Sequence, residues 1–293
     1  MKQVTIVGLG LIGASLGLAL KQLKNPPRVI GNDTQYDTAT RASKVKAVDR
    51  VERYLPDAVV GSDVVVVATP ISEVAQVLQA VAGSLEPGCV VTDTGSTKRE
   101  IVRGAAEILP SNVSFVGGHP MTGRATAGVD DPSASLFRDT VYCLTPTAAT
   151  PEEDVARVAS MIADIGAQAY FLDPEEHDGL VAGISHLPYL VSASLMRVLS
   201  AEASWREMSE LAAGGFELST RLAGQDPVIY GDMLATNSDN VARYLERLIE
   251  SLSAARDKLR SAQPRLSAEL EGAQKARIAW EEERRKALLR AKQ

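Results

Sequence analysis

Cysteine and histidine are scarce in this sequence, with two cysteines and three histidines among 293 residues. Both cysteines, Cys89 and Cys143, lie in apolar runs that have the character of strands. Two cysteines placed in this way are not typical of a disulfide framework or of a metal site. We therefore expect two buried free thiols in a reducing cytoplasm, and no metal centre.

The sequence also lacks an uninterrupted apolar run of about eighteen residues, which a transmembrane helix requires. A strand pattern begins at residue 4, so we expect no secretory signal ahead of it. The net charge is −6, and no basic tract stands apart from acidic neighbours before the extreme C-terminus. Nucleic acid and membranes are therefore not expected partners, and a cytoplasmic protein is predicted.

The first part of the chain alternates short apolar runs with helical patterns, which is typical of an α/β fold. The predicted strands are residues 4–7, 28–33, 63–68, 89–93, 113–117, 140–145 and 167–172. Residues 63–68 show no polar alternation, which indicates a strand covered on both faces. We predict a Rossmann domain over residues 1–172, with a doubly wound and mostly parallel sheet.

From residue 173 the strand signals end and long helical patterns follow. One helix has an apolar seam at spacings of four and three, formed by Val241, Leu245, Leu248, Leu252, Ala255 and Leu259. Such a seam favours packing against another helix. We predict an all-α domain over residues 173–263 that pairs with a second copy to form a homodimer.

Residues 264–293 follow Pro264 and form a charge-dense segment with a helical pattern. A solvated helix is the ordinary interpretation of such a run. A contact with a partner through Trp280 and Leu288 is the alternative, and the sequence does not decide between the two.

The N-terminal motif is G-x-G-x-x-G, placed directly between a predicted strand and a predicted helix. Gly8 permits the tight turn, Gly10 lets a pyrophosphate approach the backbone, and Gly13 lets the helix pack on the strand. Leu11 and Ile12 open the helix, whose N-terminus offers free N–H groups to phosphates. This arrangement predicts a dinucleotide-binding loop.

Asp33 ends the second predicted strand, twenty residues after the last glycine of the motif. A carboxylate there accepts hydrogen bonds from ribose hydroxyls and repels a 2′-phosphate, which favours NAD over NADP. The absence of Arg and Lys between Asn32 and Arg41 supports the same choice. Thr69 and Pro70 follow the third long apolar run, at the edge where α/β sheets bind ligands, and are predicted cofactor contacts.

Three more motifs follow predicted strands or lie in the helical part. The first runs from Asp93 to Lys98 and presents Ser96 and Lys98, although Ser96 could simply cap a helix. The second places His119 between glycines and a proline after a strand, where we expect a rigid turn and an outward ring. The third joins the pair His177-Asp178 to the segment that contains His186 and Tyr189.

Together these motifs resemble the prephenate/arogenate dehydrogenases of tyrosine biosynthesis, over residues 2–259. The matching segments are GLGLIG, DTGSTK (93–98), GGHPMTG (117–123), HD (177–178), ISHLP (184–188) and STRLA (219–223). The resemblance implies a Rossmann domain joined to a helical dimerisation domain. It also implies oxidative decarboxylation of prephenate or arogenate, with NAD+ reduced to NADH and CO2 released.

The resemblance further implies roles for individual residues. His119 would accept the proton of the ring hydroxyl as hydride leaves for the nicotinamide, and Ser96 would bond the same hydroxyl or the carboxamide. Arg221 would clamp a substrate carboxylate, because a guanidinium can bind it through two hydrogen bonds. His186 would lie near the mouth of the site, and Lys98 beside the substrate.

Three positions depart from the pattern of the family. Tyr189 stands where many members have histidine, and Ala125 where many have glutamate. Leu218 replaces an aspartate, and Glu217 beside it could supply the missing acid. These positions surround the substrate side chain, so the choice between prephenate and arogenate, and feedback by tyrosine, stay open.

Two other interpretations remain. One is another Rossmann-plus-helical dehydrogenase of the β-hydroxyacid type, which usually has a catalytic lysine in the helical domain; here no lysine follows residue 173 before Lys258. The other is a non-catalytic NAD-binding sensor, which would have no need of His119 as a base.

Overall fold

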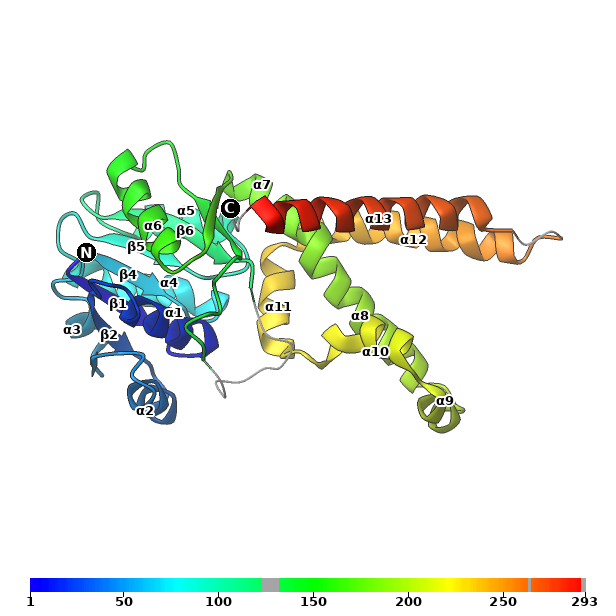
Figure 1. Cartoon of the computed structure of the whole chain (residues 1–293), viewed down its shortest axis with the longest axis horizontal. Helices are drawn as coiled ribbons and strands as arrows, with labels where there is room; N and C mark the ends of the chain where they lie inside the picture. The colour runs from blue at the N-terminus through cyan, green and yellow to red at the C-terminus, as the bar shows by residue number, and fades with distance from the viewer. Residues whose placement is uncertain (123–131, 263–264, 291–293) are drawn as a thin grey trace. The chain divides into compact units, whose positions relative to one another are not determined.

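The computed structural model describes residues 1–122, 132–262 and 265–290. The chain forms two compact units, residues 1–240 and 241–293. The first unit contains an eight-stranded sheet with helices on both faces, followed by a series of helices (Figure 1). This confirms the predicted α/β Rossmann fold followed by helical structure.

The strand order in the sheet is β3-β2-β1-β4-β5-β6-β7-β8. All neighbours pair in parallel except β6 and β7, which are antiparallel. The order reverses between β1 and β4, the position at which doubly wound sheets bind ligands. The strands are β1 (Gln3–Val7), β2 (Arg28–Asn32), β3 (Arg50–Val51), β4 (Val64–Val67), β5 (Val90–Asp93), β6 (Ser114–Pro120), β7 (Val141–Thr145) and β8 (Gln168–Phe171).

All seven predicted strands are present, and β3 is an additional one. Strand β3 has only two residues, which is too short for a periodic pattern to indicate. The sheet domain also contains α1 (Leu11–Lys21), α2 (Tyr36–Lys44), α3 (Leu55–Ala58), α4 (Ile71–Val81), the 3₁₀ turn η1 (Ala82–Ser84), α5 (Arg99–Ile108) and α6 (Glu152–Asp164).

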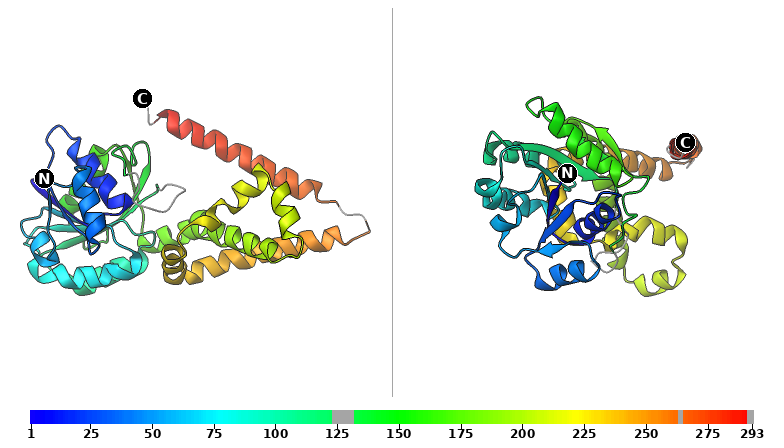
Figure 2. Two further views of the ribbon diagram at one scale, coloured as in Figure 1. Left: turned by 90° about the horizontal axis from the view of Figure 1, so that it is seen from below. Right: turned by 60° about the vertical axis from the view of Figure 1, so that its left-hand side comes forward.

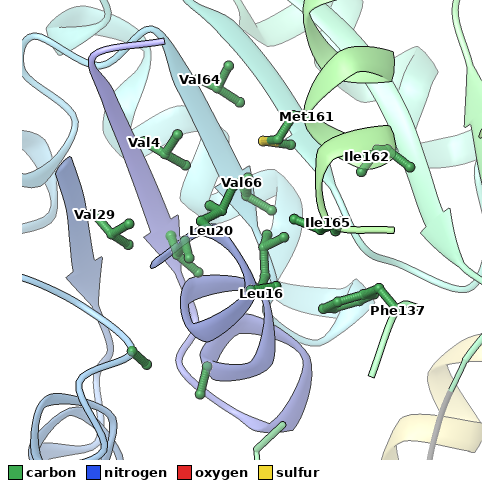
Figure 3. Close-up of a cluster of buried hydrophobic side chains, with 14 of the residues drawn as sticks. Val4, Leu16, Leu20, Val29, Val64, Val66, Phe137, Met161, Ile162 and Ile165 are labelled. Carbon is green, nitrogen blue, oxygen red and sulfur yellow. The ribbon is translucent and has the colours of Figure 1, made fainter. Parts of the chain in front are cut away.

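The hydrophobic core has one layer on each face of the sheet. On one face Val64 and Val66 of β4 pack with side chains of α1 and α6, among them Leu16 and Met161 (Figure 3). On the other face Val65 and Val67 belong to a cluster with α4 and α5. All four valines of β4 are fully buried, as the unbroken apolar run predicts.

The helices that follow β8 are α7 (Pro174–Val181), η2 (Ala182–His186), α8 (Leu187–Ser200), α9 (Trp205–Leu211), α10 (Gly214–Thr220), η3 (Arg221–Gly224), α11 (Pro227–Thr236), α12 (Ser238–Leu259) and α13 (Ser267–Arg290). Segment η2 is a π-helical turn between α7 and α8. Pro188 has no N–H and would clash with the carbonyl four residues earlier, so a wider turn lets the helix continue past it. His186 lies in this turn.

The continuous helical run Pro174–Ser200 is long and apolar enough, by length and composition alone, to cross a membrane. Buried helices of globular proteins have the same properties, so a single run of this kind is weak evidence. Its first turns contain His177 and Asp178, whose side chains are fully buried and bonded to the sheet domain.

Helix α12 carries the predicted apolar seam. Leu252 and Leu259 are 61% and 59% exposed in the single chain. Every described side chain of α13 is exposed, and Figure 2 shows α13 diverging from α12. The Trp280 ring contacts the guanidinium of Arg277, 4.6 Å from its centroid. Pro264 and the side chain of Leu288 lie outside the described part of the chain.

Candidate active site

The glycine motif forms the turn between β1 and α1, and each glycine has a different reason to lack a side chain. Gly8 has a φ of +92°, and a Cβ there would lie 2.5 Å from the Ala68 carbonyl oxygen. A Cβ on Gly13 would lie 1.9 Å from the Gly8 carbonyl oxygen, because α1 packs so close to β1. At Gly10 a Cβ would meet no atom within 4 Å, so this position faces open space. Only Gly10 leaves room for a ligand, as a phosphate-binding turn requires.

The other predicted cofactor residues surround this turn. Leu11 and Ile12 form the first turn of α1 and are half-buried. Thr69 and Pro70 follow β4, and the Thr69 nitrogen lies 3.0 Å from the position that a Cβ on Gly8 would take. The loops that follow β1 and β4 therefore touch at the point where the strand order reverses.

Asp33 joins the glycine turn to the end of β2. Its two carboxylate oxygens accept hydrogen bonds from the backbone N–H groups of Leu9 and Gln35, each at 2.7 Å. Each oxygen keeps a second lone pair for a ribose hydroxyl. Asp33 also lines a pocket of about 490 Å³ together with Thr34, Tyr36, Ala39, Thr40, Ser43, Lys44, Val51 and Arg53.

Two basic residues line this pocket although the stretch between Asn32 and Arg41 contains no Arg or Lys. Lys44 comes from the end of α2, and Arg53 from the segment after β3, with its guanidinium 5.0 Å from the centre of the Tyr36 ring. The expectation of NAD over NADP therefore rests on Asp33 itself rather than on the absence of cations nearby.

Lys98 forms a buried ion pair with Asp93, and both side chains have no exposed surface. The Lys98 ammonium also donates to the Gly118 carbonyl at 2.6 Å, while the other Asp93 oxygen accepts from the Gly118 N–H at 3.0 Å. Burial lowers the pKa of Lys98, and the Asp93 carboxylate opposes that effect. The pair holds both backbone groups of Gly118, next to His119, and the substrate contact predicted for Lys98 stays a prediction.

Ser96 does not cap α5. The helix begins at Arg99 without a side-chain cap from its own segment. The cap comes from α7, because the Asp178 carboxylate accepts from the backbone N–H groups of Lys98 and Arg99 at 2.7 and 3.0 Å. Ser96 is half-buried, and its hydroxyl has no hydrogen-bond partner among the described residues. It is therefore available to a ligand.

His119 lies within β6 rather than in a turn after it, which corrects the sequence prediction. Strand β6 continues to Pro120 because it pairs with antiparallel β7, so that His119 faces Cys143 in the register. A Cβ on Gly118 would lie 2.5 Å from the Asp93 carbonyl oxygen, so the glycine before His119 permits close packing against β5. The predicted Gly123 and Ala125 lie outside the described residues.

His119 is only 9% exposed, and burial lowers its pKa well below the ordinary value of 6.5. Electrostatic interactions with His177, Lys98 and His186 lower this pKa further. The lowered pKa makes His119 a neutral base over a wider range of pH than an unperturbed imidazole would be.

The pair His177-Asp178 connects His119 to the helical part of the chain. His119 Nδ1 lies 2.9 Å from His177 Nε2, and His177 Nδ1 lies 2.8 Å from Asp178 Oδ1. All three residues are buried. The sequence showed the pair without indicating a role, because its partner is 58 residues away in the chain.

His186 is also fully buried and has one free ring nitrogen. The Asn237 amide donates to the Asp178 carbonyl at 2.7 Å and lies 3.2 Å from His186 Nδ1. Asn240 bonds the other end of that amide, which fixes its orientation. His186 Nδ1 therefore accepts, and His186 Nε2 has no partner among the described residues. Burial lowers the pKa of His186 to about 4, so the free Nε2–H is a neutral donor near pH 7.

The remaining predicted substrate residues are Tyr189, Arg221 and Glu217, of which Tyr189 belongs to a stacked pair of tyrosines. Tyr189 of α8 stacks on Tyr230 of α11, with ring centres 3.9 Å apart. Burial and the neighbouring Tyr189 raise the pKa of Tyr230, and the charge of Arg221 opposes this. Arg221 and Glu217 are exposed in the single chain. No contact in the described structure joins either of them to His119.

Sequence reasoning missed Asp93, Asn237 and Tyr230 as parts of this region. Asp93 opens the motif that contains Ser96, so a strand that ends in a buried acid could have drawn attention to it. Asn237 and Tyr230 lie in ordinary helical sequence, where no local signal marks them.

Two family profiles together match most of the chain. Residues 16–171 match "Prephenate dehydrogenase, nucleotide-binding domain", and residues 173–270 match "Prephenate dehydrogenase, dimerization domain". The chain is also 34% identical to the prephenate dehydrogenase of Bacillus subtilis over 256 residues, which cover 86% of this chain and 69% of that protein.

Solved structures agree with these profiles. Synechocystis arogenate dehydrogenase is similar with a TM-score of 0.80 and 30% identity, covering 95% of this chain and 99% of that one. The A. aeolicus prephenate dehydrogenase, solved with hydroxyphenyl propionate and NAD+, has a TM-score of 0.88 and 27% identity, covering 95% and 98%. With the glycine turn, Asp33 and His119 in place, the chain belongs to the prephenate dehydrogenase family.

Proposed function

We propose that this chain converts prephenate to 4-hydroxyphenylpyruvate, or arogenate to tyrosine, by oxidative decarboxylation with NAD+. Membership of the family makes it an NAD-dependent dehydrogenase. The observation that carries the reaction is His119, a buried neutral imidazole whose Nδ1 is occupied by His177. Its Nε2 has no partner among the described residues and is the nitrogen left to accept a proton.

The residues present fit a dinucleotide. The open side of the glycine turn at Gly10 admits a pyrophosphate beside the N-terminus of α1, and Asp33 has lone pairs free for the ribose. Bound NAD+ would supply the hydride acceptor. The chain would hold it with Gly8, Gly10, Leu11, Ile12, Gly13, Asp33, Thr69 and Pro70.

On the substrate side, His119 Nε2 would take the proton of the ring hydroxyl while hydride leaves the same carbon. The ring carboxylate then leaves as CO2, and aromatisation of the ring drives the step. Ser96 would bond the hydroxyl or the carboxamide. His186 would donate its free Nε2–H to a ligand oxygen, and Arg221 would bind a carboxylate through two hydrogen bonds.

Glu217 and Tyr189 are the proposed residues near the substrate side chain. An acid there favours the ammonium of arogenate over the keto group of prephenate. Glu217 is exposed in the single chain, which leaves its side chain free to turn toward a ligand.

We also propose a cytoplasmic homodimer formed through the helical part of the chain. A profile described as a dimerization domain matches residues 173–270, and the seam positions Leu252 and Leu259 are exposed in the single chain. Cys89 and Cys143 are buried free thiols, which suits a reducing compartment.

The direct test is NADH formation with prephenate and with arogenate at matched concentrations. We expect NADH with at least one of them, accompanied by release of CO2. Absence of NADH with both would contradict the proposal. Oxidation of a 3-hydroxy acid without CO2 would indicate the β-hydroxyacid alternative instead.

A further inference from the structure

The side chains of Asp178, His177 and His119 form a continuous row of hydrogen bonds, which we name the imidazole chain. It runs from the start of α7 to β6, with separations of 2.8 Å between Asp178 and His177 and 2.9 Å between His177 and His119. His177 and Asp178 are fully buried, so water does not compete for these bonds.

Asp178, at one end of the imidazole chain, is held in place by the fold. Both carboxylate oxygens accept backbone N–H groups at the N-terminus of α5, from Lys98 and Arg99. The positive end of a helix dipole stabilises the ionised form of such a carboxylate. An ionised carboxylate can only accept hydrogen bonds, so His177 Nδ1 must carry the proton of the bond between them.

Because Asp178 can only accept, the direction of each hydrogen bond in the imidazole chain follows. Neutral His177 has one ring proton, on Nδ1, so its Nε2 has a lone pair and accepts from His119 Nδ1–H. Neutral His119 then has no proton on Nε2. The bond made by one ring nitrogen sets the protonation of the other, and an isolated neutral histidine ordinarily prefers the opposite form, with its proton on Nε2.

We propose that His177 is a positioning residue, which holds His119 in the tautomer whose Nε2 can accept a proton. Asp178 acts through His177 and sets the donor-to-acceptor direction of the hydrogen bonds in the imidazole chain. When Nε2 takes a proton, the resulting imidazolium still donates its Nδ1–H to His177 Nε2, and no further proton transfer is required. The proposal rests on the proposed function, in which His119 accepts the substrate proton.

Nuclear magnetic resonance tests the tautomer without any substrate. The full chain labelled with ¹⁵N-histidine contains three imidazoles, and a His186→Gln variant assigns one of them. At neutral pH we expect His119 to show a protonated Nδ1 and a bare Nε2. A spectrum with the proton on His119 Nε2 would overturn the proposal, whatever the enzyme turns over.

Two variants of His177 separate positioning from folding. His177→Gln keeps an acceptor oxygen for His119 Nδ1–H, whereas His177→Leu has a similar volume and no acceptor. We expect His177→Leu to lower kcat about 10- to 1000-fold and to lose the single His119 tautomer, because misorienting a base has effects of this size. His177→Gln should restore the tautomer and a large part of kcat.

The Kd for NAD+ should be the same in both variants, because neither changes the glycine turn. Glu176→Gln removes a carboxylate from the exposed side of the same helix and should leave kcat unchanged. Wild-type kcat and an unchanged His119 tautomer in His177→Leu would refute the positioning role. Failure of the wild-type chain to oxidise either substrate would instead refute the proposed function.

Discussion

At the scale of single residues, burial decides the chemistry of this site. His119 and His186 are both withdrawn from solvent, and burial lowers the pKa of each because it disfavours the charged imidazolium. A base must be neutral before it accepts a proton, so the lowered pKa of His119 extends the range of pH in which it can act.

The first prediction concerns His119. Protonation of this residue removes the base, so kcat/KM should fall only as pH drops through a pKa well below 6.5. The titratable groups around it are His177, Asp178, Lys98 and His186, together with Cys143, which faces it from β7. The His119→Ala variant should lower kcat about 10²–10⁴-fold. Pre-steady-state and steady-state rates of NADH formation measure both effects.

Wild-type turnover in His119→Ala would show that the proton goes to another acceptor or to solvent. An acidic limb near or above 6.5 would contradict the effect of burial that the structure indicates.

The second prediction concerns Asp33. Its carboxylate should disfavour a 2′-phosphate by about 1–3 kcal/mol, and Asp33→Ser should narrow the gap in kcat/KM between NAD+ and NADP+. Arg53→Ala is the matched control, because it removes a cation from the same pocket and should widen the gap. Equal kcat/KM with both cofactors in the wild-type chain would contradict this role of Asp33.

At the scale of elements, strand β6, which carries His119, is held in place by segments that lie far apart in the sequence. Strand β6 is extended by antiparallel β7, and the Asp93–Lys98 pair holds the backbone of Gly118 from β5 and the start of α5. Asp178 of α7 then caps α5. The position of His119 on β6 therefore depends on four other elements, which are β5, β7, α5 and α7.

The third prediction concerns this ion pair. Lys98→Met leaves the Asp93 carboxylate buried without its partner and should lower the free energy of unfolding by about 3–5 kcal/mol. Urea unfolding followed by circular dichroism measures the loss. The double variant with Asp93→Asn should recover part of it, because the uncompensated charge is removed. A raised substrate KM at unchanged stability would instead support the substrate contact expected from sequence.

The fourth prediction concerns Arg221, at the start of η3. Arg221→Ala should raise the substrate KM strongly and leave the Kd for NAD+ unchanged, because it removes a charge-assisted contact with substrate alone. Arg206→Ala on α9, where the side chain is 88% exposed, is the matched control and should change neither value. A parallel loss of cofactor affinity would indicate a structural role for Arg221.

At the scale of the whole molecule, the helical part leaves apolar side chains exposed that a single chain does not cover. Leu218 and Leu211 are 75% and 83% exposed, and the seam positions Leu252 and Leu259 on α12 are more than half exposed. Apolar surface of this extent, in a segment that matches a dimerization profile, favours a second copy as its cover.

The fifth prediction is that Leu252→Lys combined with Leu259→Lys weakens the dimer. Light scattering at micromolar concentration should give twice the 31.2 kDa chain mass for the wild type and a lower mass for the variant. The pair Arg284→Ala and Arg285→Ala on α13 is a control of similar size and should leave the mass unchanged. A monomeric wild type would contradict the proposed homodimer.

The sequence by itself determined the elements and the chemistry that depends on short stretches of chain. Seven strands, the glycine turn and the helical second part follow from local periodicity and from spacings within about twenty residues. The motifs that carry the family resemblance, His119 among them, are also local. Short-range patterns of this kind are visible because each element imposes its own period on the side chains.

Only the tertiary structure decided how the functional groups are oriented and which charges are buried. His119 meets His177 across 58 residues, and Asp178 caps α5 across 80. Lys98 looked like a ligand contact in sequence but lies in a buried ion pair. A side chain's partners, its burial and therefore its pKa depend on which elements pack together, and packing joins residues whose separation in the chain follows no period.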